Sequence, residues 1–318
     1  MPMSIVIDLQ QIKSIVKKLD VIAAMKEGFI AYSNGNAVVP PVGELIFEDP
    51  PGDVHIKYGY IKKEAFYVIK IASGFYENPK LGVASGQGLM LLFKQQTGEL
   101  VAVLLDEGHL TDIRTAAAGA LAVKSFGPQK INAVGIIGTG VQAKLQLLQM
   151  QENNPCKQVW LWGRNQAPAA RLKAELADDF EVHLASSCAE LAQHANVIIT
   201  CTPAEKPLLK VADIQPGTLI VAVGSDTQHK QELDSEILQK ADLVIADSIR
   251  QSRSRGEIYQ AVKAGDILEN KVIELGNALQ NAKLQGLKDQ QIIVVDLTGV
   301  AVQDIKIASA VYSNLITQ

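Results

Sequence analysis

Apolar residues recur at two different spacings in the first third of the chain. Between Leu9 and Ser33 they follow a helical repeat, and Asp20 stands where it can cap a second helix. From residue 43 to residue 103 the pattern changes to short β-rich runs separated by Pro-Pro-Gly, Asn-Pro and Thr-Gly turns. These runs are Val54–Tyr60, Ala65–Ile71, Gly88–Phe93 and Leu100–Leu105. This part of the sequence predicts a largely antiparallel sheet behind a pair of helices.

The pattern changes again from Leu110 onward. Thr111–Phe126 is an alanine-rich predicted helix, and beyond it strand-length apolar runs alternate with helical repeats. Such alternation is typical of a parallel, doubly wound sheet, so the fold class is α/β, with a Rossmann domain joined to an α+β domain. The predicted strands are Ile131–Ile137, Val159–Trp162, Val197–Thr200, Leu219–Ala222, Leu243–Ala246 and Ile292–Asp296. The predicted helices include Val141–Glu152, Ala167–Asp178, Ser187–Gln193 and a last one, Val302–Ile316.

Composition and charge narrow the class of protein. The 318 residues are 47% hydrophobic and 20% charged with a formal net charge of −4, which is typical of a globular protein. Mild acidity argues against a nucleic-acid surface, and the cluster Arg250, Arg253 and Arg255 is more typical of a solvated helix face or a phosphate contact. The N-terminus lacks the order of a signal peptide, and the apolar runs are too short to span a membrane.

The three cysteines, Cys156, Cys188 and Cys201, are widely spaced and form no Cys-x-x-Cys pair. This spacing argues against a disulfide framework and against a cysteine-rich zinc site, and it fits a reducing compartment. We therefore expect a cytoplasmic protein with no metal site and with neither nucleic acid nor membrane among its partners.

A glycine motif follows the first predicted strand of the Rossmann part. Gly138, Gly140 and Ala143 form a G-x-G-x-x-A pattern between that strand and a helix. The first glycine permits a tight turn, the second lets the backbone approach a pyrophosphate, and the small alanine lets helix and strand pack closely. The helix N-terminus adds amide donors and partial positive charge. A purely structural glycine turn is the alternative, but strand, motif and helix together favour a dinucleotide site.

The end of the second strand bears on the choice of dinucleotide. An NAD site usually carries an acidic residue there, whereas this strand runs into Gly163, Arg164 and Asn165. The planar guanidinium of Arg164 suits a 2′-phosphate, so NADP(H) is favoured and NAD(H) is the alternative. The alternative, that Arg164 is an ordinary cation of a loop and binds no phosphate, stays open. Thr202, after the fourth strand, either contacts the ribose or nicotinamide or forms a turn before Pro203.

Several stretches together resemble the ornithine cyclodeaminase/mu-crystallin family over nearly the whole chain. They are Lys70–Gly74, Leu110–Ala117, Gly138–Ala143, Ala222–Leu233 and Asp296–Asp304. Residues 74–79, read Gly-Phe-Tyr-Glu-Asn-Pro, and the Leu110–Ala118 helix are most similar to the ectoine-utilisation branch. The resemblance implies a homodimer, with residues 1–113 and 300–318 as an α+β dimerisation and substrate domain and residues 114–299 as the Rossmann domain. It also implies an active site in the cleft between the two domains.

By this resemblance, Lys70 and Arg114 hold the carboxylate of a small amino or imino acid, which matches the ability of arginine and lysine to bind an anion. Arg114 opens an alanine-rich helix, where a cation opposes the helix dipole unless it meets an anion. Lys70 as a solvent-facing strand lysine is the alternative. Asp226 matches the acid/base group of the cyclodeaminases, although a loop aspartate is often only a turn residue, and Lys230 matches a cofactor-contacting lysine.

The chain departs from the family where many members carry a third carboxylate-binding arginine. Here Gly43 or Glu44 occupies that place. Either Lys57 supplies the missing charge, or Glu44 pairs with a cationic group of the substrate. We further expect Val141, Gln142 and Ser85 to contact the cofactor and Thr298 to contact the substrate.

Three functions agree with these residues. The first is an NAD(P)H-dependent imine reductase or amino-acid dehydrogenase that transfers hydride to C2 of a ketimine such as a pyrroline-type acid. The second is an ornithine-type cyclodeaminase, which oxidises a diamino acid, closes a ring, releases ammonia and returns the hydride. The third is a non-enzymatic ligand-binding protein like mu-crystallin, which the intact set of candidate residues disfavours.

Overall fold

The structure, a computed structural model, describes residues 4–75, 77–151, 154–288 and 290–317, so Tyr76 of the branch-specific segment lies outside it. The chain divides into two compact units. The first unit contains residues 1–114 and 300–318, and the second contains residues 115–299. Arg114 therefore falls with the first unit, because the division lies inside one helix.

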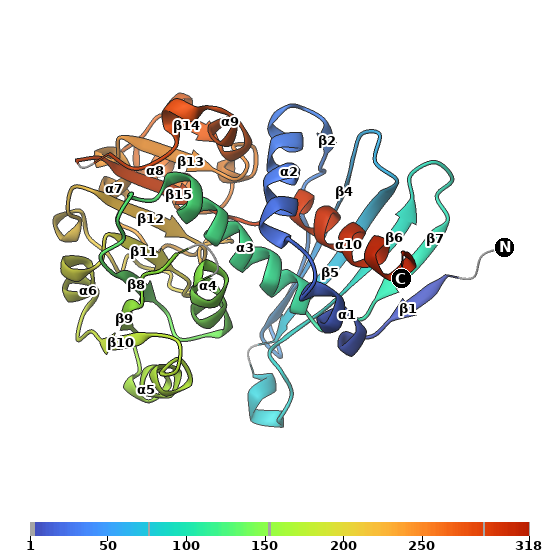
Figure 1. The fold of residues 1–318 in the computed structure, drawn as a ribbon, viewed down its shortest axis with the longest axis horizontal. Coiled ribbons are helices and arrows are strands. Elements are labelled where there is room, and N and C mark those ends of the chain that lie inside the picture. The colour runs from blue at the N-terminus through green and yellow to red at the C-terminus, as the bar shows by residue number, and fades with distance from the viewer. Residues whose placement is uncertain (1–3, 76, 152–153, 289, 318) are drawn as a thin grey trace. The chain divides into compact units, whose positions relative to one another are not determined.

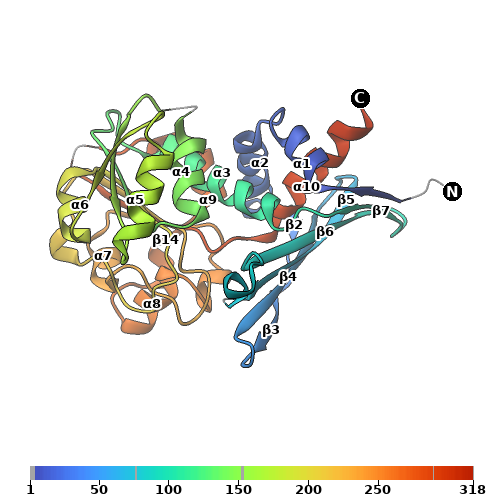
Figure 2. The same ribbon diagram turned by 90° about the horizontal axis from the view of Figure 1, so that it is seen from below.

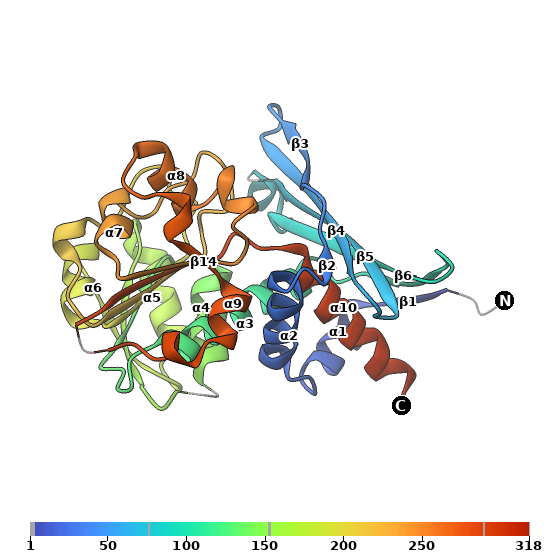
Figure 3. The ribbon, with the colours of Figure 1, turned by 90° about the horizontal axis from the view of Figure 1, so that it is seen from above.

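The first unit is a mainly antiparallel sheet with helices on one face. Its sheet order is β1-β7-β6-β5-β4-β2, β3 pairs with β4, and only the β1–β7 pair is parallel within this described sheet. Figures 1 and 3 show α1, α2 and α10 on one side of this sheet. The elements are β1 (Ile5–Ile7), α1 (Leu9–Val16), α2 (Val21–Ser33), β2 (Ala37–Val38), β3 (Gly43–Phe47), β4 (Gly52–Ile61), β5 (Phe66–Phe75), the short 3-10 helix η1 (Asn78–Leu81), β6 (Gly86–Lys94), β7 (Leu100–Leu104), the start of α3 (His109–Phe126) and α10 (Ala301–Ile316).

Local sequence signals explain the helices of the first unit. Asp8 and Gln11 form a capping box at α1, and the Asp20 carboxylate accepts a hydrogen bond from the Ala23 backbone N–H (2.9 Å), as predicted. The helices α2 and α10 approach closely at Gly28, where a Cβ would lie 3.2 Å from the Val302 carbonyl oxygen, which is closer than ordinary van der Waals contact. This contact seats α10 beside α2 and over β4 and β5, which matters for the site below.

The second unit is a parallel sheet with helices on both faces, as Figures 1 and 2 show. The order is β10-β9-β8-β11-β12-β15-β13-β14, which reverses direction at β8, between β9 and β11. The prediction of a doubly wound Rossmann sheet is confirmed, and ligands of such sheets bind at the carboxyl ends of the strands at this reversal. The elements are β8 (Val134–Ile137), α4 (Val141–Gln151), β9 (Gln158–Trp162), α5 (Gln166–Glu175), β10 (Glu181–Leu184), α6 (Cys188–His194), β11 (Val197–Thr200), β12 (Thr218–Ala222), α7 (Ser235–Lys240), β13 (Leu243–Ala246), α8 (Glu257–Ala264), β14 (Val272–Glu274), α9 (Leu275–Gln280) and β15 (Ile292–Asp296).

Several details differ from the prediction, among them the strands β1, β2 and β3, which were not predicted. The strand expected from Ile131 begins only at Val134, because its first residues pair with no neighbouring strand. The strands β10 and β14 were not predicted either. The first alternates polar and apolar residues at the sheet edge, and the second has only three residues.

No helix within the described residues is long and apolar enough to cross a membrane.

The close packing of β8 against α6 gives a test of the fold. A Cβ on Gly135 would overlap Leu191 and lie 3.0 Å from the Ala195 Cβ, whereas a Cβ on Gly140 would meet nothing within 4 Å. Overpacking of this kind typically costs about 1–3 kcal/mol. Gly135→Ala should therefore lower the free energy of unfolding by about that amount in urea titrations, and Gly140→Ala should leave it nearly unchanged. Equal stability of the two variants would contradict the described packing.

Candidate functional site

Four buried charged residues meet in the first unit. Lys57 on β4 and Lys70 on β5 are directly opposite in the antiparallel register, so their side chains share one face of the sheet. Arg114 comes from α3, and Asp304 comes from α10, which covers that face. Their exposed fractions are 7% for Lys57, 2% for Lys70, 3% for Arg114 and 1% for Asp304. The structure thus brings together three predicted cations and one carboxylate that was not predicted.

Asp304 is the centre of this cluster. Its Oδ1 accepts a hydrogen bond from Arg114 Nε at 2.7 Å and lies 3.3 Å from Lys70 Nζ. Arg114 is held on a second side by Gln303, whose Oε1 accepts from Arg114 Nη1 at 3.1 Å. Among the described residues, none donates a hydrogen bond to the buried Oδ2 of Asp304. One carboxylate oxygen therefore orients both predicted carboxylate-binding cations.

The protonation of the cluster reflects its burial and its excess of positive charge. Burial, Arg114 and Lys57 lower the pKa of Lys70 to about 7, and Asp304 only partly offsets them. Burial favours a neutral Asp304, but Arg114 and both lysines outweigh it and hold the pKa of this carboxyl below its usual value. Asp106, which caps α3 through the Leu110 N–H (2.8 Å), has its pKa raised by burial. The Lys70 ammonium thus changes charge near neutral pH.

The prediction that Arg114 opens a helix is wrong. Arg114 lies in the second turn of α3, which begins at His109, so it does not open the helix. The anion that it meets is Asp304, from a helix 190 residues later in the chain. The only sequence signal for Asp304 was its place at the end of the family-like stretch Asp296–Asp304.

The predicted glycine turn of the second unit lies against a pocket of about 280 Å³. The residues that line it include the predicted cofactor residues Gly138, Gly140, Arg164 and Thr202. Gly138 has a positive φ of 133°, and a Cβ there would lie 2.8 Å from Cys201 Sγ, so the turn needs glycine both for its conformation and for its close packing. Gly140 instead borders open space, which is what a pyrophosphate approaching the backbone requires.

The remaining cofactor candidates lie around or beyond this pocket. Arg164 is exposed at the end of β9, and the structure describes no acidic residue among those lining the pocket. Val141 is the exposed first residue of α4, and the Gln142 Oε1 accepts a hydrogen bond from Gln146 (3.2 Å). Ser85 belongs to the first unit, where it is exposed and its carbonyl accepts from the Phe75 N–H (2.8 Å). Of these four candidates, only Ser85 therefore lies outside the unit that contains the pocket.

A buried glutamate joins the loops that follow β11 and β12. Glu232 is fully buried and accepts hydrogen bonds from groups of Thr200, Thr202 and Gly224. Burial raises the pKa of Glu232 to about 7, although these hydrogen bonds oppose the rise. Sequence reasoning did not assign Glu232 a role, because an acidic residue after a predicted turn usually faces solvent.

Asp226 and Lys230, predicted for two different tasks, form one ion pair. Lys230 Nζ donates to Asp226 Oδ1 at 2.6 Å, and the two side chains are 23% and 45% exposed, respectively. The Arg255 guanidinium also donates to the Asp226 carbonyl at 3.3 Å. The candidate acid/base residue Asp226 thus lies on the loop after β12, where Lys230 and Arg255 both donate hydrogen bonds to it.

The last two candidates have protein partners in the structure. Glu44 on β3 lies opposite His55 on β4, with 3.6 Å between Glu44 Oε1 and His55 Nδ1. Thr298 is buried, and its hydroxyl donates to Asp247 and accepts from Gln251, both at 2.8 Å. Thr298 is therefore held inside the second unit, whereas the Glu44 side chain keeps 38% of its surface exposed.

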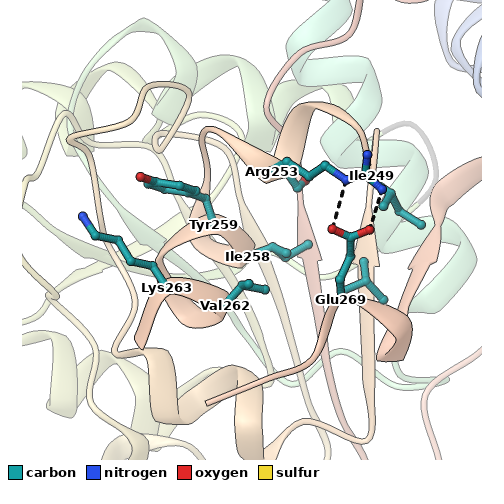
Figure 4. Close-up of a pocket in the computed structure, with 9 residues that line it drawn as sticks. Ile249, Arg253, Ile258, Tyr259, Val262, Lys263 and Glu269 are labelled. Atoms are coloured by element: carbon teal, nitrogen blue, oxygen red, sulfur yellow. Dashed lines mark hydrogen bonds and ion pairs between the residues drawn. The ribbon is translucent and has the colours of Figure 1, made fainter. Parts of the chain in front are cut away.

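A second pocket of about 190 Å³ lies over α8, as Figure 4 shows. Its rim carries a two-pronged pair between Arg253 and Glu269 at 3.0 and 2.7 Å, and its floor is apolar. None of the predicted site residues lines it. Arg253, from the arginine cluster of the sequence, is therefore part of an exposed ion pair, which contributes little to stability.

Comparisons with known proteins agree with the motifs. A relative from Sinorhizobium fredii, named as an uncharacterized cyclodeaminase, is 38% identical over 298 residues, or 92% of this chain and 90% of the relative. An archaeal alanine dehydrogenase dimer with bound NAD matches with a TM-score of 0.89 and 29% identity, over 99% of this chain and 96% of its own. Thermococcus litoralis Δ1-pyrroline-2-carboxylate reductase, solved with NADH and L-proline, matches with a TM-score of 0.91 and 26% identity, over 98% and 97% of the two chains.

The sequence pattern of a family agrees with these relatives. The pattern of the ornithine cyclodeaminase/mu-crystallin family matches residues 4–318, which include both units and all the stretches that carried the resemblance. The glycine turn and the buried cations of this chain lie within that match. The chain therefore belongs to the ornithine cyclodeaminase/mu-crystallin family.

Proposed function

We propose that this protein is an NAD(P)-dependent oxidoreductase that acts on the C=N or CH–NH group of a small 2-imino or 2-amino acid. The observation that carries the proposal is the buried cluster of Lys57, Lys70 and Arg114 around the carboxylate of Asp304. Because these cations are shielded from water, an anion beside them would be strongly attracted and would in turn favour their charged forms. A substrate carboxylate beside the reacting carbon is such an anion.

The cluster of Lys57, Lys70 and Arg114, called the carboxylate clamp below, also explains how the reacting carbon would be fixed. Arginine can bind a carboxylate through two parallel hydrogen bonds, and a lysine adds a second charge. Because Asp304 and Gln303 already orient the Arg114 guanidinium, little side-chain freedom is lost when substrate binds. Lys57 takes the place of the arginine that many relatives carry, and Glu44, beside His55, would face the amine end of the substrate.

The residues of the second unit fit a dinucleotide. Gly138, Gly140 and the N-terminus of α4 would hold the pyrophosphate, and Thr202 would contact the ribose or nicotinamide side. The cofactor supplies the hydride when it is bound. The proton of the reaction is the task of the protein, and Asp226, with Lys230 as its counter-ion, would handle it directly or through water.

The reductase is favoured over the cyclodeaminase, which stays the second candidate. Two solved relatives with nicotinamide cofactors bear the names of a reductase and a dehydrogenase, whereas the relative from Sinorhizobium fredii bears the name of a cyclodeaminase. The reductase should consume NADPH when given cyclic imino acids. A cyclodeaminase would instead release ammonia from ornithine with no added reductant, and this outcome would replace the proposal.

We also propose that the first unit carries the substrate site and a homodimer interface, and that the protein works in the cytoplasm. The edge strand β3 exposes three large apolar side chains in a row: Leu45 (54%), Ile46 (71%) and Phe47 (40%). An exposed apolar edge of this kind is a liability unless a partner covers it. A second copy of the chain fits this role, and an archaeal relative is a dimer.

The dimer predicts a particle of about twice 34.3 kDa in light scattering at micromolar concentration. Ile46→Asp places a charge on the exposed edge and should shift the particle toward a single chain. Leu268→Asp, at an equally exposed apolar residue of the second unit (64%), is the matched control and should leave the mass unchanged. A single 34.3 kDa species for the unaltered protein would rule out the dimer.

Cofactor choice is predicted from Arg164. Arg164→Ala should raise the Michaelis constant for NADPH and leave that for NADH nearly unaffected, because only NADPH carries the 2′-phosphate. Arg171→Ala, at an exposed arginine of α5, serves as the control and should change neither constant. Equal weakening of both cofactors by Arg164→Ala would show that this arginine does not bind the 2′-phosphate.

The carboxylate clamp is predicted from Lys70 and Arg114. Loss of a charge-assisted hydrogen bond costs about 1.5–3 kcal/mol, and misplacing the reacting carbon adds to that cost. Arg114→Ala and Lys70→Ala should each lower kcat/KM by roughly 10- to 1000-fold, with little change in NADPH affinity. Lys94→Ala, at a partly exposed strand lysine that pairs with Glu99, is the control. Unaltered turnover in Lys70→Ala would remove this lysine from the site.

A further inference from the structure

Glu232 binds two separate loops with one side chain. Its Oε1 accepts from the backbone N–H of Thr202 (2.6 Å) and from the Thr202 hydroxyl (2.7 Å). Its Oε2 accepts from the Thr200 hydroxyl (2.8 Å) and from the backbone N–H of Gly224 (2.9 Å). Because β11 and β12 are adjacent parallel strands, Glu232 fastens together the two loops that leave their carboxyl ends. We call this set of four hydrogen bonds the Glu232 clasp.

The clasp requires a carboxylate. Each carboxylate oxygen faces one backbone N–H, from Thr202 on one side and Gly224 on the other, and neither N–H can turn away as a hydroxyl can. A glutamine of the same shape must direct its NH₂ group toward one of these two donors in either orientation. Such a side chain can hold one loop and must leave a buried donor of the other loop unpaired.

Gly224 shows how closely the two loops are held. A Cβ at this position would overlap the Thr202 carbonyl and would lie 2.5 Å from Glu232 Oε2 and 2.5 Å from the Thr202 nitrogen. The glycine is therefore needed for the approach of the loops and not for an unusual backbone conformation, since its φ is outside the left-handed region. The loop that carries Asp226 starts at this point of contact.

A second buried glutamate, Glu257, holds the backbone of the residue that forms the clasp. Glu257 accepts from the backbone N–H of Glu232 (2.7 Å) and of Leu233 (3.1 Å). The backbone that carries the clasp is therefore itself anchored to α8. Two layers of carboxylate hydrogen bonds thus set the position of the loops after β11 and β12.

The place of these loops in the sheet indicates what they serve. A bound dinucleotide would lie across the point where the strand order reverses, and Arg164, after β9, would hold its adenosine half. The loops after β11 and β12 would then adjoin its nicotinamide half. Thr202 lines the pocket on that side, whereas Glu232 is fully buried and cannot touch the ligand.

We propose that Glu232 is a positioning residue that holds Thr202 and the Gly224–Asp226 loop in place for the nicotinamide half of the cofactor. This inference rests on the proposed function, since it presupposes a nicotinamide dinucleotide in the pocket. It assigns Glu232 no direct part in hydride or proton transfer. Its effect should therefore be confined to the half of the cofactor that the clasped loops adjoin.

The test compares ligands that differ only by the nicotinamide. Binding of NADPH and of 2′-phospho-ADP-ribose is measured by titration calorimetry, with NADH and ADP-ribose as a parallel pair in case the protein prefers NAD(H). In Glu232→Gln we expect the Kd for NADPH to rise roughly 10- to 100-fold, as when one or two buried hydrogen bonds are lost. The Kd for the nicotinamide-free ligand should stay within about twofold. With saturating NADPH, kcat should fall while the substrate KM changes little.

A second variant tests the clasp without changing Glu232. Thr200 is fully buried on β11, and its hydroxyl donates to Glu232, so Thr200→Val can reach the cofactor only through the clasp. We expect the same nicotinamide-selective weakening, with a smaller size of roughly 3- to 10-fold for one lost hydrogen bond. Thr218→Val is the matched control, because Thr218 is buried at the opposite end of the adjacent strand β12. It should alter neither affinity.

Two results would overturn the inference. Equal weakening of both ligands would mean that Glu232 only supports the fold, and unchanged NADPH affinity and kcat in both variants would mean that the clasp does not position the loops. If the unaltered protein binds neither dinucleotide, the proposed function itself fails and the inference fails with it. A protein that binds both dinucleotides but shows no selective loss would overturn the inference alone.

Discussion

The contact between Asp304 and the cations around it determines what the first unit can do. Lys57 and Lys70 are opposite each other on neighbouring strands, and like charges in this position repel. Arg114 adds a third charge from α3. The Asp304 carboxylate offsets part of this repulsion, because its Oδ1 pairs with both Arg114 and Lys70. The packing of α10 on the sheet is therefore as important to the site as the cations themselves.

Asp304 does not by itself keep Lys70 fully charged at neutral pH. Asp304 balances one cation, and the pKa of Lys70 is lowered to about 7 by burial, Arg114 and Lys57. A ligand carboxylate would reverse this shift, since it favours the charged ammonium. The second unit follows a similar principle in its own site, where buried carboxylates of Glu232 and Glu257 hold backbone donors of the loops that follow β11 and β12. In each unit a buried acid arranges the groups that would meet a ligand.

Much of this organisation could be predicted from the sequence. The glycine turn at Gly138 and Gly140 and the strands around it have strong local signals, because turn geometry and apolar runs depend on neighbouring residues. The candidates Lys70 and Arg114 came from motifs of the family. Their partner Asp304 was not predicted, because its contact with Arg114 joins residues that are 190 positions apart in the chain. Glu232 was missed for the same reason, since no local pattern distinguishes a buried glutamate from a solvated one.

The central claim, that the cluster around Asp304 binds a carboxylate and that Lys70 gains a proton in doing so, can be measured by calorimetry. Binding of cyclopentanecarboxylate, which has a ring and a carboxylate but no amine, is titrated in two buffers of different ionisation heat. With a Lys70 pKa of about 7, binding should take up a large fraction of a proton at about pH 8 and almost none at about pH 6, where Lys70 already carries its charge. Lys70→Met should abolish the uptake. Binding heats that do not depend on the buffer at about pH 8 in the unaltered protein would contradict the account.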